Sequence, residues 1–259
     1  MLLAADVGNT EITLGLFAGD RLLAHWRLTT DVSRTPDEWA AMLTSFLTHA
    51  GHSTHEVRAA VEASVAPGVT EVLAEGVELA LGLRPVAIGP GLALDITLDV
   101  EEPHSVGADR VVNTVAAAAL YGRDTIVVDF GTATTFDCIT KDGTFLGGVI
   151  APGVRTAAEN LSLKAAKLPA TELVPPERVI GRRTEECIRA GVLLGTADSV
   201  DGIVRRIKEE WPTGDIPQVV ATGGLADVVA PLCKEIETVE PQLTLLGLKV
   251  AAGRLGLKW

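Results

Sequence analysis

The sequence has few cysteines and no long apolar run, and both shortages exclude classes of protein. Three cysteines, Cys138, Cys187 and Cys233, occur among 259 residues. An odd number of widely spaced thiols offers neither a disulfide framework nor zinc-ligand spacing, so we expect a reduced, cytoplasmic protein with each cysteine buried as a small apolar residue. The mean hydropathy is high, at +0.30. No stretch approaches the roughly 20 apolar residues of a membrane-spanning helix, and we expect no membrane partner.

Basic charge is also scarce. Lysine and arginine number 22 against 34 acidic residues, which gives a net charge of −12. Nucleic acids and anionic membranes select basic surfaces, so neither is an expected partner. Binding of ATP is not excluded, because a phosphate site needs only local backbone donors and a bound cation. The first residues lack a basic segment and Asp6 interrupts them, which predicts a buried strand rather than a signal peptide.

The chain contains an internal repeat. Residues 2–10 read LLAADVGNT and residues 126–135 read IVVDFGTATT. Each segment is a short apolar strand, then Asp-x-Gly, then small hydroxyl or amide residues. A strand–turn–strand pattern follows each, with turns at Gly19-Asp20 and Asp142-Gly143. Each half is therefore predicted to open with a strand, a phosphate-type turn and a hairpin.

Helices are predicted after each opening. Thr35, Pro36 and Glu38 form the pattern of a capping box with proline at the first helical position, and Gly51 is a plausible stop. Further helical patterns cover residues 110–121, 184–211, 225–236 and 242–257, and strand patterns cover residues 59–64, 86–88 and 218–221. This alternation predicts an α/β fold of two similar halves, residues 1–118 and 119–259, each a mixed sheet flanked by helices, with a cleft between them.

The two Asp-x-Gly segments are candidate phosphate loops. Gly8 allows a sharp turn and a close approach to phosphate, and Asn9, Thr10 and Thr13 offer donors. Asp6 could hold Mg²⁺, which prefers oxygen ligands, and the residues alone suggest the same role for Asp129. Either segment by itself is also compatible with an ordinary turn at a strand end. Two copies at matching places favour phosphate binding.

Two further motifs carry chemistry. Gly223 and Gly224 follow an apolar strand and could leave room for a ribose or a flat ring, although paired glycines also occur in generic turns. Asp109 could orient an alcohol and take its proton, and Arg110 could pair with an anionic substrate. The alternative for Asp109 is a helix N-cap. The spacing alone does not decide between these readings.

Together the motifs resemble those of type III pantothenate kinases, within the actin/hexokinase/Hsp70 superfamily. The resemblance covers nearly the whole chain. It rests on residues 6–10, 63–67, 107–110, 129–135, 147–153, 181–184 and 223–224, in that order. It implies an actin-like fold for each half and transfer of the γ-phosphoryl group of ATP to the 4′-hydroxyl of pantothenate, the first step toward coenzyme A.

Carried over, the resemblance implies roles for individual residues. Asp109 would be the catalytic base, Asp6 would lie near Mg²⁺, and Asp129 would hold a monovalent cation, K⁺ or NH₄⁺. The implied ATP-binding residues are Asp6, Val7, Gly8, Asn9, Thr10, Glu11, Ile12, Thr13, Gly131, Thr132, Gly223 and Gly224. The implied pantothenate-binding residues are Val100, Gly107, Ala108, Asp109, Arg110 and Thr184, with Thr184 contributed across a homodimer interface. Without the resemblance, the position of Thr184 favours a helix N-cap.

One segment departs from the family pattern. Some members carry an aromatic residue in the substrate pocket where this chain has Leu98, Asp99 and Val100. Two other functions therefore remain open at this point: a kinase of the same superfamily that acts on another alcohol or a sugar, and a non-catalytic nucleotide-binding regulator. The presence of Asp6, Asp109 and Asp129 argues against the regulator.

Overall fold

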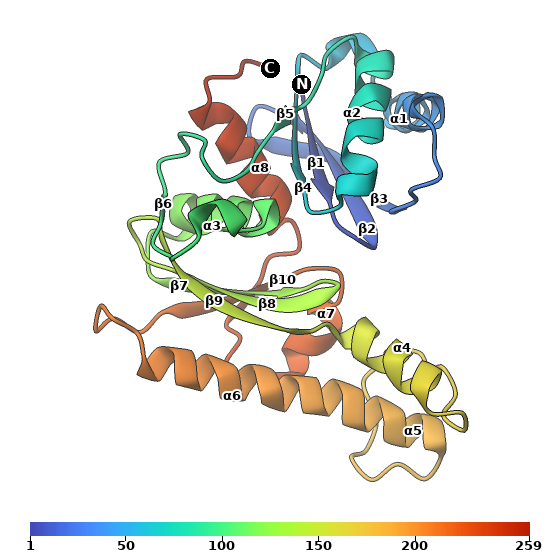
Figure 1. Cartoon of the computed structure of the whole chain (residues 1–259), viewed down its shortest axis with the longest axis vertical. Coiled ribbons are helices and arrows are strands. Elements are labelled where there is room, and N and C mark those ends of the chain that lie inside the picture. The colour runs from blue at the N-terminus through green and yellow to red at the C-terminus, as the bar shows by residue number, and fades with distance from the viewer. The chain divides into compact units, whose positions relative to one another are not determined.

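The computed structural model describes residues 1–259, and its contacts divide the chain into two units (Figure 1). Unit 1 comprises Met1–Leu120 and Leu243–Trp259, and unit 2 comprises Tyr121–Gln242. The division after residue 120 lies close to the expected one after residue 118. The last helix, α8 (Leu243–Arg254), differs from expectation because it belongs to unit 1. Leu245 and Leu248 bury their side chains in the unit 1 core, which explains the difference.

Unit 1 is built on a mixed five-stranded sheet. The strands are β1 (Leu2–Val7), β2 (Glu11–Ala18), β3 (Arg21–Thr29), β4 (Ala59–Ser64) and β5 (Val86–Ala87). They lie in the order β3-β2-β1-β4-β5, with β1 antiparallel to β2 and parallel to β4. The predicted opening of a strand, a turn and a hairpin is therefore confirmed.

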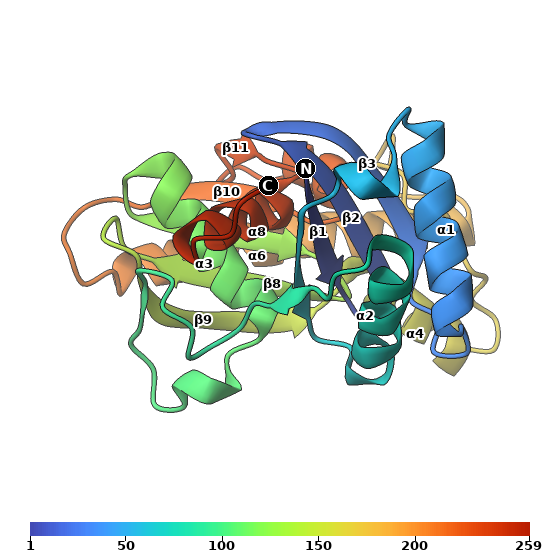
Figure 2. The same ribbon diagram turned by 90° about the horizontal axis from the view of Figure 1, so that it is seen from above.

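Helices cover both faces of this sheet. They are α1 (Pro36–His49), α2 (Pro67–Leu81), α3 (Ala108–Tyr121) and α8. Side chains alternate across β1, so Leu3 packs in the cluster with α1 and α2, whereas Leu2 packs in the cluster with α3 and α8. Figure 2 shows α1 and α2 on one side of the strands and α8 on the other.

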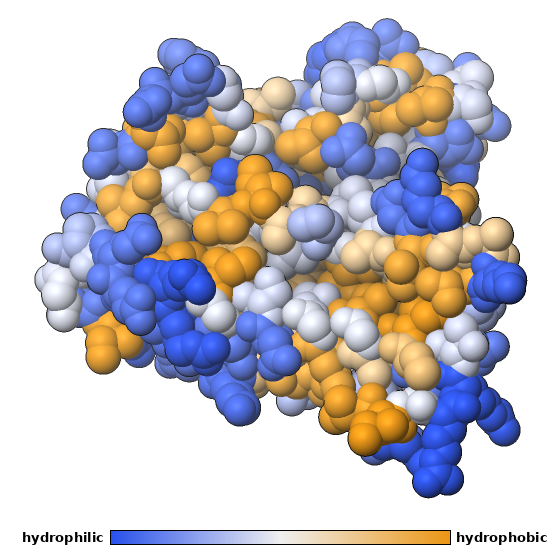
Figure 3. Space-filling model, turned by 60° about the horizontal axis from the view of Figure 1, so that its bottom comes forward, coloured by the Kyte–Doolittle hydropathy of each residue, from blue (hydrophilic) through white to orange (hydrophobic).

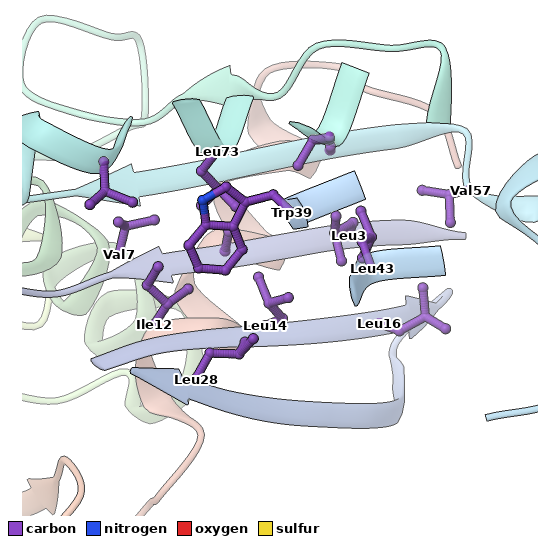
Figure 4. Packing of buried hydrophobic residues seen from close by; sticks show 14 of the residues in the cluster. Leu3, Val7, Ile12, Leu14, Leu16, Leu28, Trp39, Leu43, Val57 and Leu73 are labelled. Atoms are coloured by element: carbon purple, nitrogen blue, oxygen red, sulfur yellow. The ribbon is translucent and has the colours of Figure 1, made fainter. Parts of the chain in front are cut away.

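The core beneath α1 is centred on an indole. Trp39 is 2% exposed and lies among side chains from β1, β2 and α2, as Figure 4 shows. The helix begins with the predicted capping box: Thr35 Oγ1 accepts from the N–H of Glu38 at 3.4 Å, and Glu38 Oε2 accepts from the N–H of Thr35 at 2.8 Å. These bonds satisfy two donors that the first turn would otherwise leave unpaired, and they fix the point at which α1 starts.

Unit 2 repeats the arrangement. Its strands are β7 (Thr125–Phe130), β8 (Ala133–Ile139), β9 (Thr144–Pro152), β10 (Gln218–Thr222) and β11 (Thr238–Val239), in the order β11-β10-β7-β8-β9. As in unit 1, the first strand is antiparallel to the second and parallel to the strand on its other side. The long helix α6 (Gly195–Glu209) packs Val200 and Val204 against this sheet.

Two helix predictions need correction or refinement. The pattern over residues 184–211 is helical but contains three parts, α5 (Thr184–Arg189), a π-helical turn (Ala190–Leu194) and α6. The helix expected over residues 225–236 is only α7 (Ala226–Val229) followed by a 3-10 turn (Ala230–Leu232). Pro231 ends it, because proline lacks an N–H and clashes with the preceding turn of an α-helix.

Other elements were not predicted. They are α2, α4 (Val154–Lys164), the short strands β6 (Thr97–Leu98) and β11, and 3-10 turns at Thr54–Glu56 and Pro103–Ser105. None of the helices combines the length and the apolar character needed to cross a membrane. All three cysteines are free thiols. Cys138 is buried as expected, Cys233 is half-buried and Cys187 is exposed.

Candidate active site

The first Asp-x-Gly loop is the turn between β1 and β2. Asp6 is half-buried at the end of β1, directly opposite Thr13 on β2. The N–H of Gly8 donates to the carbonyl oxygen of Glu11 at 3.0 Å, which closes the turn. A Cβ atom on Gly8 would lie 2.8 Å from that same oxygen, so the turn requires glycine here. Asn9 and Thr10 are exposed at its tip.

Several residues implied as ATP ligands contribute only backbone to this surface. The side chains of Val7 and Ile12 are fully buried in the core. The carboxylate of Glu11 is held by Arg27, whose Nε and Nη2 donate to its two oxygens at 2.6 and 2.8 Å. Side-chain donors and acceptors for a ligand therefore come from Asp6, Asn9, Thr10 and Thr13.

The second Asp-x-Gly loop repeats this geometry in unit 2. β7 has the same burial pattern as β1: every residue is buried except the fifth, which is half-buried and is Asp129 in β7. Asp129 pairs with Thr135 on β8 and with Thr222 on β10. Gly131 and Thr132 form the exposed tip. The repeat in the sequence is therefore also a repeat in the structure. In each unit a carboxylate lies at the end of the first strand.

The Gly-Gly loop of unit 2 adjoins Asp129. Gly223 has φ +92°, and a Cβ atom there would overlap Oδ1 of Asp129 and approach the backbone nitrogen of Phe130 to 2.7 Å. Gly224 beside it is exposed. The backbone of Gly223 therefore packs directly against the carboxylate of Asp129.

In unit 1, Val65 connects the first loop to the segment of Asp109. The N–H of Val65 donates to the carbonyl oxygen of Val7 at 3.0 Å. Cγ1 of Val65 lies 3.6 Å from where a Cβ atom of Gly107 would be. That same Cβ atom would lie 2.5 Å from Oδ1 of Asp109. Glycine at position 107 therefore makes room for the carboxylate, and three motifs from distant parts of the sequence meet.

Asp109 is not a helix N-cap. The helix α3 begins at Ala108, so Asp109 lies within its first turn, where Oδ1 accepts from the N–H of Arg110 at 2.8 Å. Burial raises the pKa of the Asp109 carboxyl, against the opposing effects of this hydrogen bond and of the Arg110 charge. A desolvated carboxylate with a raised pKa is a stronger proton acceptor than one in water, as a general base must be.

Thr184 is also not an N-cap. The cap of α5 is Arg183, and Thr184 is the exposed first residue of that helix. It lines a cavity of about 580 Å³ whose walls are mostly apolar and include Ile188 and Leu161. Thr134, from the second Asp-x-Gly segment, lines the same cavity, and its buried hydroxyl has no hydrogen-bond partner.

Three other residues implied in pantothenate binding lie in unit 1. Val100 is half-buried in the segment after β6, and Ala108 and Arg110 are half-buried at the start of α3. No group of three or more His, Cys, Asp or Glu side chains is arranged to hold a metal ion.

Three residues that contact the loops had no role assigned from the sequence. Thr30 Oγ1 donates to the carbonyl oxygen of Gly8 at 2.6 Å, and Thr156 Oγ1 donates to that of Thr132 at 2.8 Å. A Cβ atom on Gly153 would overlap the carbonyl oxygens of Thr132 and Gly131. No local pattern marks Thr30 or Thr156 in the sequence, because their bonds join residues 22 and 24 positions apart.

Comparison with known proteins gives consistent results. A family model described as type III pantothenate kinase matches residues 2–206. A type III pantothenate kinase from Moorella thermoacetica is 47% identical over 254 residues, which cover 98% of this chain and 99% of that protein.

Solved structures share the fold at low identity. The activator of 2-hydroxyisocaproyl-CoA dehydratase from Clostridium difficile, with bound ADPNP, has a TM-score of 0.58 at 12% identity and covers 100% of this chain and 98% of its own. A ROK hexokinase from Thermus thermophilus has a TM-score of 0.52 at 16% identity, with 99% of each chain covered. These two structures support the fold, a mixed α/β arrangement shared with kinases.

Proposed function

We infer that this chain, which belongs to the type III pantothenate kinase family, transfers the γ-phosphoryl group of ATP to the 4′-hydroxyl of pantothenate. The chain is an ATP-dependent kinase of coenzyme A biosynthesis. What the family leaves to be assigned is the role of each residue, the cations and the assembly.

Asp109 is the proposed catalytic base, and the proposal rests mainly on the burial of its carboxylate beside Gly107. Phosphoryl transfer to an alcohol needs a carboxylate that orients the hydroxyl and accepts its proton. Asp109 is desolvated, its pKa is raised, and Gly107 leaves room beside it. Arg110 follows it directly and would hold the pantothenate carboxylate, for which a guanidinium is suited. Val100 would be one apolar wall of the same pocket.

The two Asp-x-Gly loops are proposed to hold the nucleotide. Unit 1 would supply Asn9, Thr10 and Thr13 to phosphate oxygens, and unit 2 would supply Thr132. The glycine pair of residues 223–224 would adjoin the adenosine, because it presents backbone without side chains. Catalysis by such loops is mostly positioning and neutralisation of charge, since phosphoryl transfer requires little covalent chemistry from the protein.

Cations are proposed at the two strand-end carboxylates. Mg²⁺ is commonly held by one or two carboxylates together with substrate phosphates, and the half-buried carboxylate of Asp6 at the end of β1 would be one such ligand. A monovalent cation, K⁺ or NH₄⁺, would be held at Asp129. Both ions would neutralise negative charge on the polyphosphate.

A homodimer through unit 2 is proposed to complete the substrate site. Large apolar side chains are exposed on or beside two helices that line the cavity of Thr184: Leu163 on α4 is 78% exposed, and Ile180, just before α5, is 82% exposed. Figure 3, in which the bottom of the view in Figure 1 comes forward, shows several areas of hydrophobic residues at the surface. The cavity that Thr184 lines is largely apolar. A second copy of the chain would bury these groups and carry its Thr184 to the pantothenate site.

The test is a coupled assay of ADP release. The full chain is given ATP and Mg²⁺, with and without pantothenate, and with K⁺ or with Na⁺ in its place. We expect release that requires pantothenate and is strongly stimulated by K⁺. Absence of pantothenate-dependent release would refute the proposed reaction. Equal rates in K⁺ and Na⁺ would refute the monovalent cation while leaving the reaction in place.

A further inference from the structure

Two threonines fasten the two Asp-x-Gly loops by the same kind of bond. In unit 1, Thr30 follows β3 directly, and its hydroxyl donates to the carbonyl oxygen of Gly8 at 2.6 Å. Its N–H donates to the carbonyl oxygen of Thr10 at 3.0 Å. One residue therefore holds both ends of the exposed tip.

In unit 2 an equivalent hydrogen bond comes from a helix. Thr156 lies in the first turn of α4, after β9, and its hydroxyl donates to the carbonyl oxygen of Thr132 at 2.8 Å. Gly153, the N-cap of α4, lies so close to the carbonyl oxygens of Gly131 and Thr132 that no side chain would fit there. The loop is thus held from one side by a hydroxyl and by close packing of backbone.

A bond to a carbonyl oxygen also orients the amide that follows it. In a planar trans peptide the C=O of one residue and the N–H of the next point in opposite directions, and the chain has no cis peptide bond. Thr30 therefore turns the N–H of exposed Asn9 away from itself. Backbone N–H groups aimed outward from a loop are ligands for phosphate oxygens. A peptide left free to rotate would have to be ordered when the nucleotide binds.

We propose that Thr30 and Thr156 are paired positioning residues, which hold the two loops in the orientation that receives the polyphosphate of ATP. The proposal rests on the proposed nucleotide-binding function of these loops. Neither threonine needs to touch the nucleotide. Each acts through the carbonyl that it fixes, so its removal weakens recognition of phosphate rather than of the adenosine or of pantothenate.

The test compares valine and serine at each position in the full chain. Valine has the shape of threonine without the hydroxyl, and serine keeps the hydroxyl. Thr48→Val and Ser162→Ala are matched controls, because Thr48 donates to the carbonyl oxygen of Thr44 at 2.8 Å and Ser162 to that of Glu159 at 2.9 Å, both away from the loops. Affinities for Mg-ATP and for adenosine are measured by calorimetry, with KM for both substrates and the melting temperature.

We expect Thr30→Val and Thr156→Val each to weaken ATP binding by about threefold to tenfold, which is the loss of one neutral hydrogen bond. Adenosine affinity and KM for pantothenate should not change, and Thr30→Ser and Thr156→Ser should restore ATP binding. Wild-type ATP affinity in both valine variants, or equal weakening for ATP and adenosine, would overturn the proposal. If Thr30→Val fails to fold, Thr156→Val decides, since its bond is at the surface. Failure of wild-type turnover would instead refute the proposed function, and the affinities would still test the threonines.

Discussion

The carboxylate of Asp129 lies against Gly223, so closely that a Cβ atom at position 223 would overlap its Oδ1 atom. The two residues are far apart in the sequence, and they meet because β10 runs parallel to β7 with Thr222 opposite Asp129. The strand that carries the proposed cation ligand therefore also positions the proposed adenosine loop. This contact makes glycine obligatory at a place where the sequence alone shows only a common turn.

Substitution of Gly223 by alanine should damage both stability and nucleotide binding. The residue has φ +92°, which disfavours alanine, and the new methyl group would displace Asp129. Gly214→Ala is the matched control, because Gly214 has φ +76° and open space around its Cβ position. We expect Gly214→Ala to cost about 1 kcal/mol of stability with KM for ATP unchanged. Gly223→Ala should cost more and raise KM for ATP by roughly tenfold or more, as measured by urea unfolding and steady-state kinetics. Equal behaviour of the two variants would show that the contact with Asp129 is unimportant.

Asp109→Asn should remove catalysis while leaving nucleotide binding in place. The amide keeps the shape of the side chain but cannot accept the proton of the alcohol, so kcat should fall by about 10²- to 10⁴-fold. In the wild type, kcat/KM should rise with pH as Asp109 loses its proton, and the midpoint should lie above the ordinary value of 3.8 because burial raises this pKa. Asp215→Asn, at an exposed ion pair with Lys141, is the control. A variant with kcat near that of wild type would show that another group is the base.

Local patterns predicted most of the strands and both loops. The capping box of α1 is confirmed because Thr35 and Glu38 bond to each other within one turn. The predicted repeat, in which Asp6 and Asp129 occupy matching positions, is confirmed because strand, turn and hairpin are each set by neighbouring residues. For the same reason Thr184 and Asp109 could be placed at helix starts. Their exclusion as N-caps depended on where each helix begins, which is poorly determined by sequence.

Features that depend on distant residues could not be predicted. Helix α8 joins unit 1 because Leu245 and Leu248 find a core built by the first half of the chain. Helix α2 was missed because Ala66 provides no side-chain cap to mark its start. The bonds of Thr30 and Thr156 join residues 22 and 24 positions apart. Such contacts follow from the assembled sheet and not from any local preference.

A buried carboxylate in β4 should make the enzyme less stable above neutral pH. Glu62 is 4% exposed and one of its oxygens has no hydrogen-bond partner. Burial raises its pKa from 4.5 to about 7; Arg84 opposes this, and Glu71 adds to it. Arg84 is itself paired with Glu71 and Glu78. Because the folded state favours the protonated form, stability is greatest below pH 4.5 as far as this group is concerned. It falls as the pH rises through about 7, by a total of about 3 kcal/mol.

Glu62→Gln should remove this dependence, since the amide is neutral at every pH. Urea unfolding from pH 5 to pH 9 should show the variant more stable than wild type by about 3 kcal/mol above pH 7, with the difference shrinking toward pH 5. Glu102→Gln, at an exposed position, should follow the wild-type curve. A constant difference between Glu62→Gln and wild type across the range would mean that Glu62 does not titrate there.

Ile180→Asp should separate the proposed dimer and impair the pantothenate site without affecting ATP. Ile180 is 82% exposed and precedes Thr184, whose hydroxyl is proposed to reach the partner's substrate. A charge placed in an apolar interface must be desolvated without a partner, which disfavours association. Ile216→Asp is the matched control, because Ile216 is 75% exposed in unit 2 but lies in the loop before β10.

Light scattering should report a dimer for wild type and Ile216→Asp and a monomer for Ile180→Asp. KM for pantothenate should rise in the monomer while ATP affinity stays unchanged, because the proposed nucleotide contacts all come from one chain. A dimeric Ile180→Asp variant would place the interface elsewhere, and a monomeric wild type with full activity would show that Thr184 acts, if at all, within its own chain.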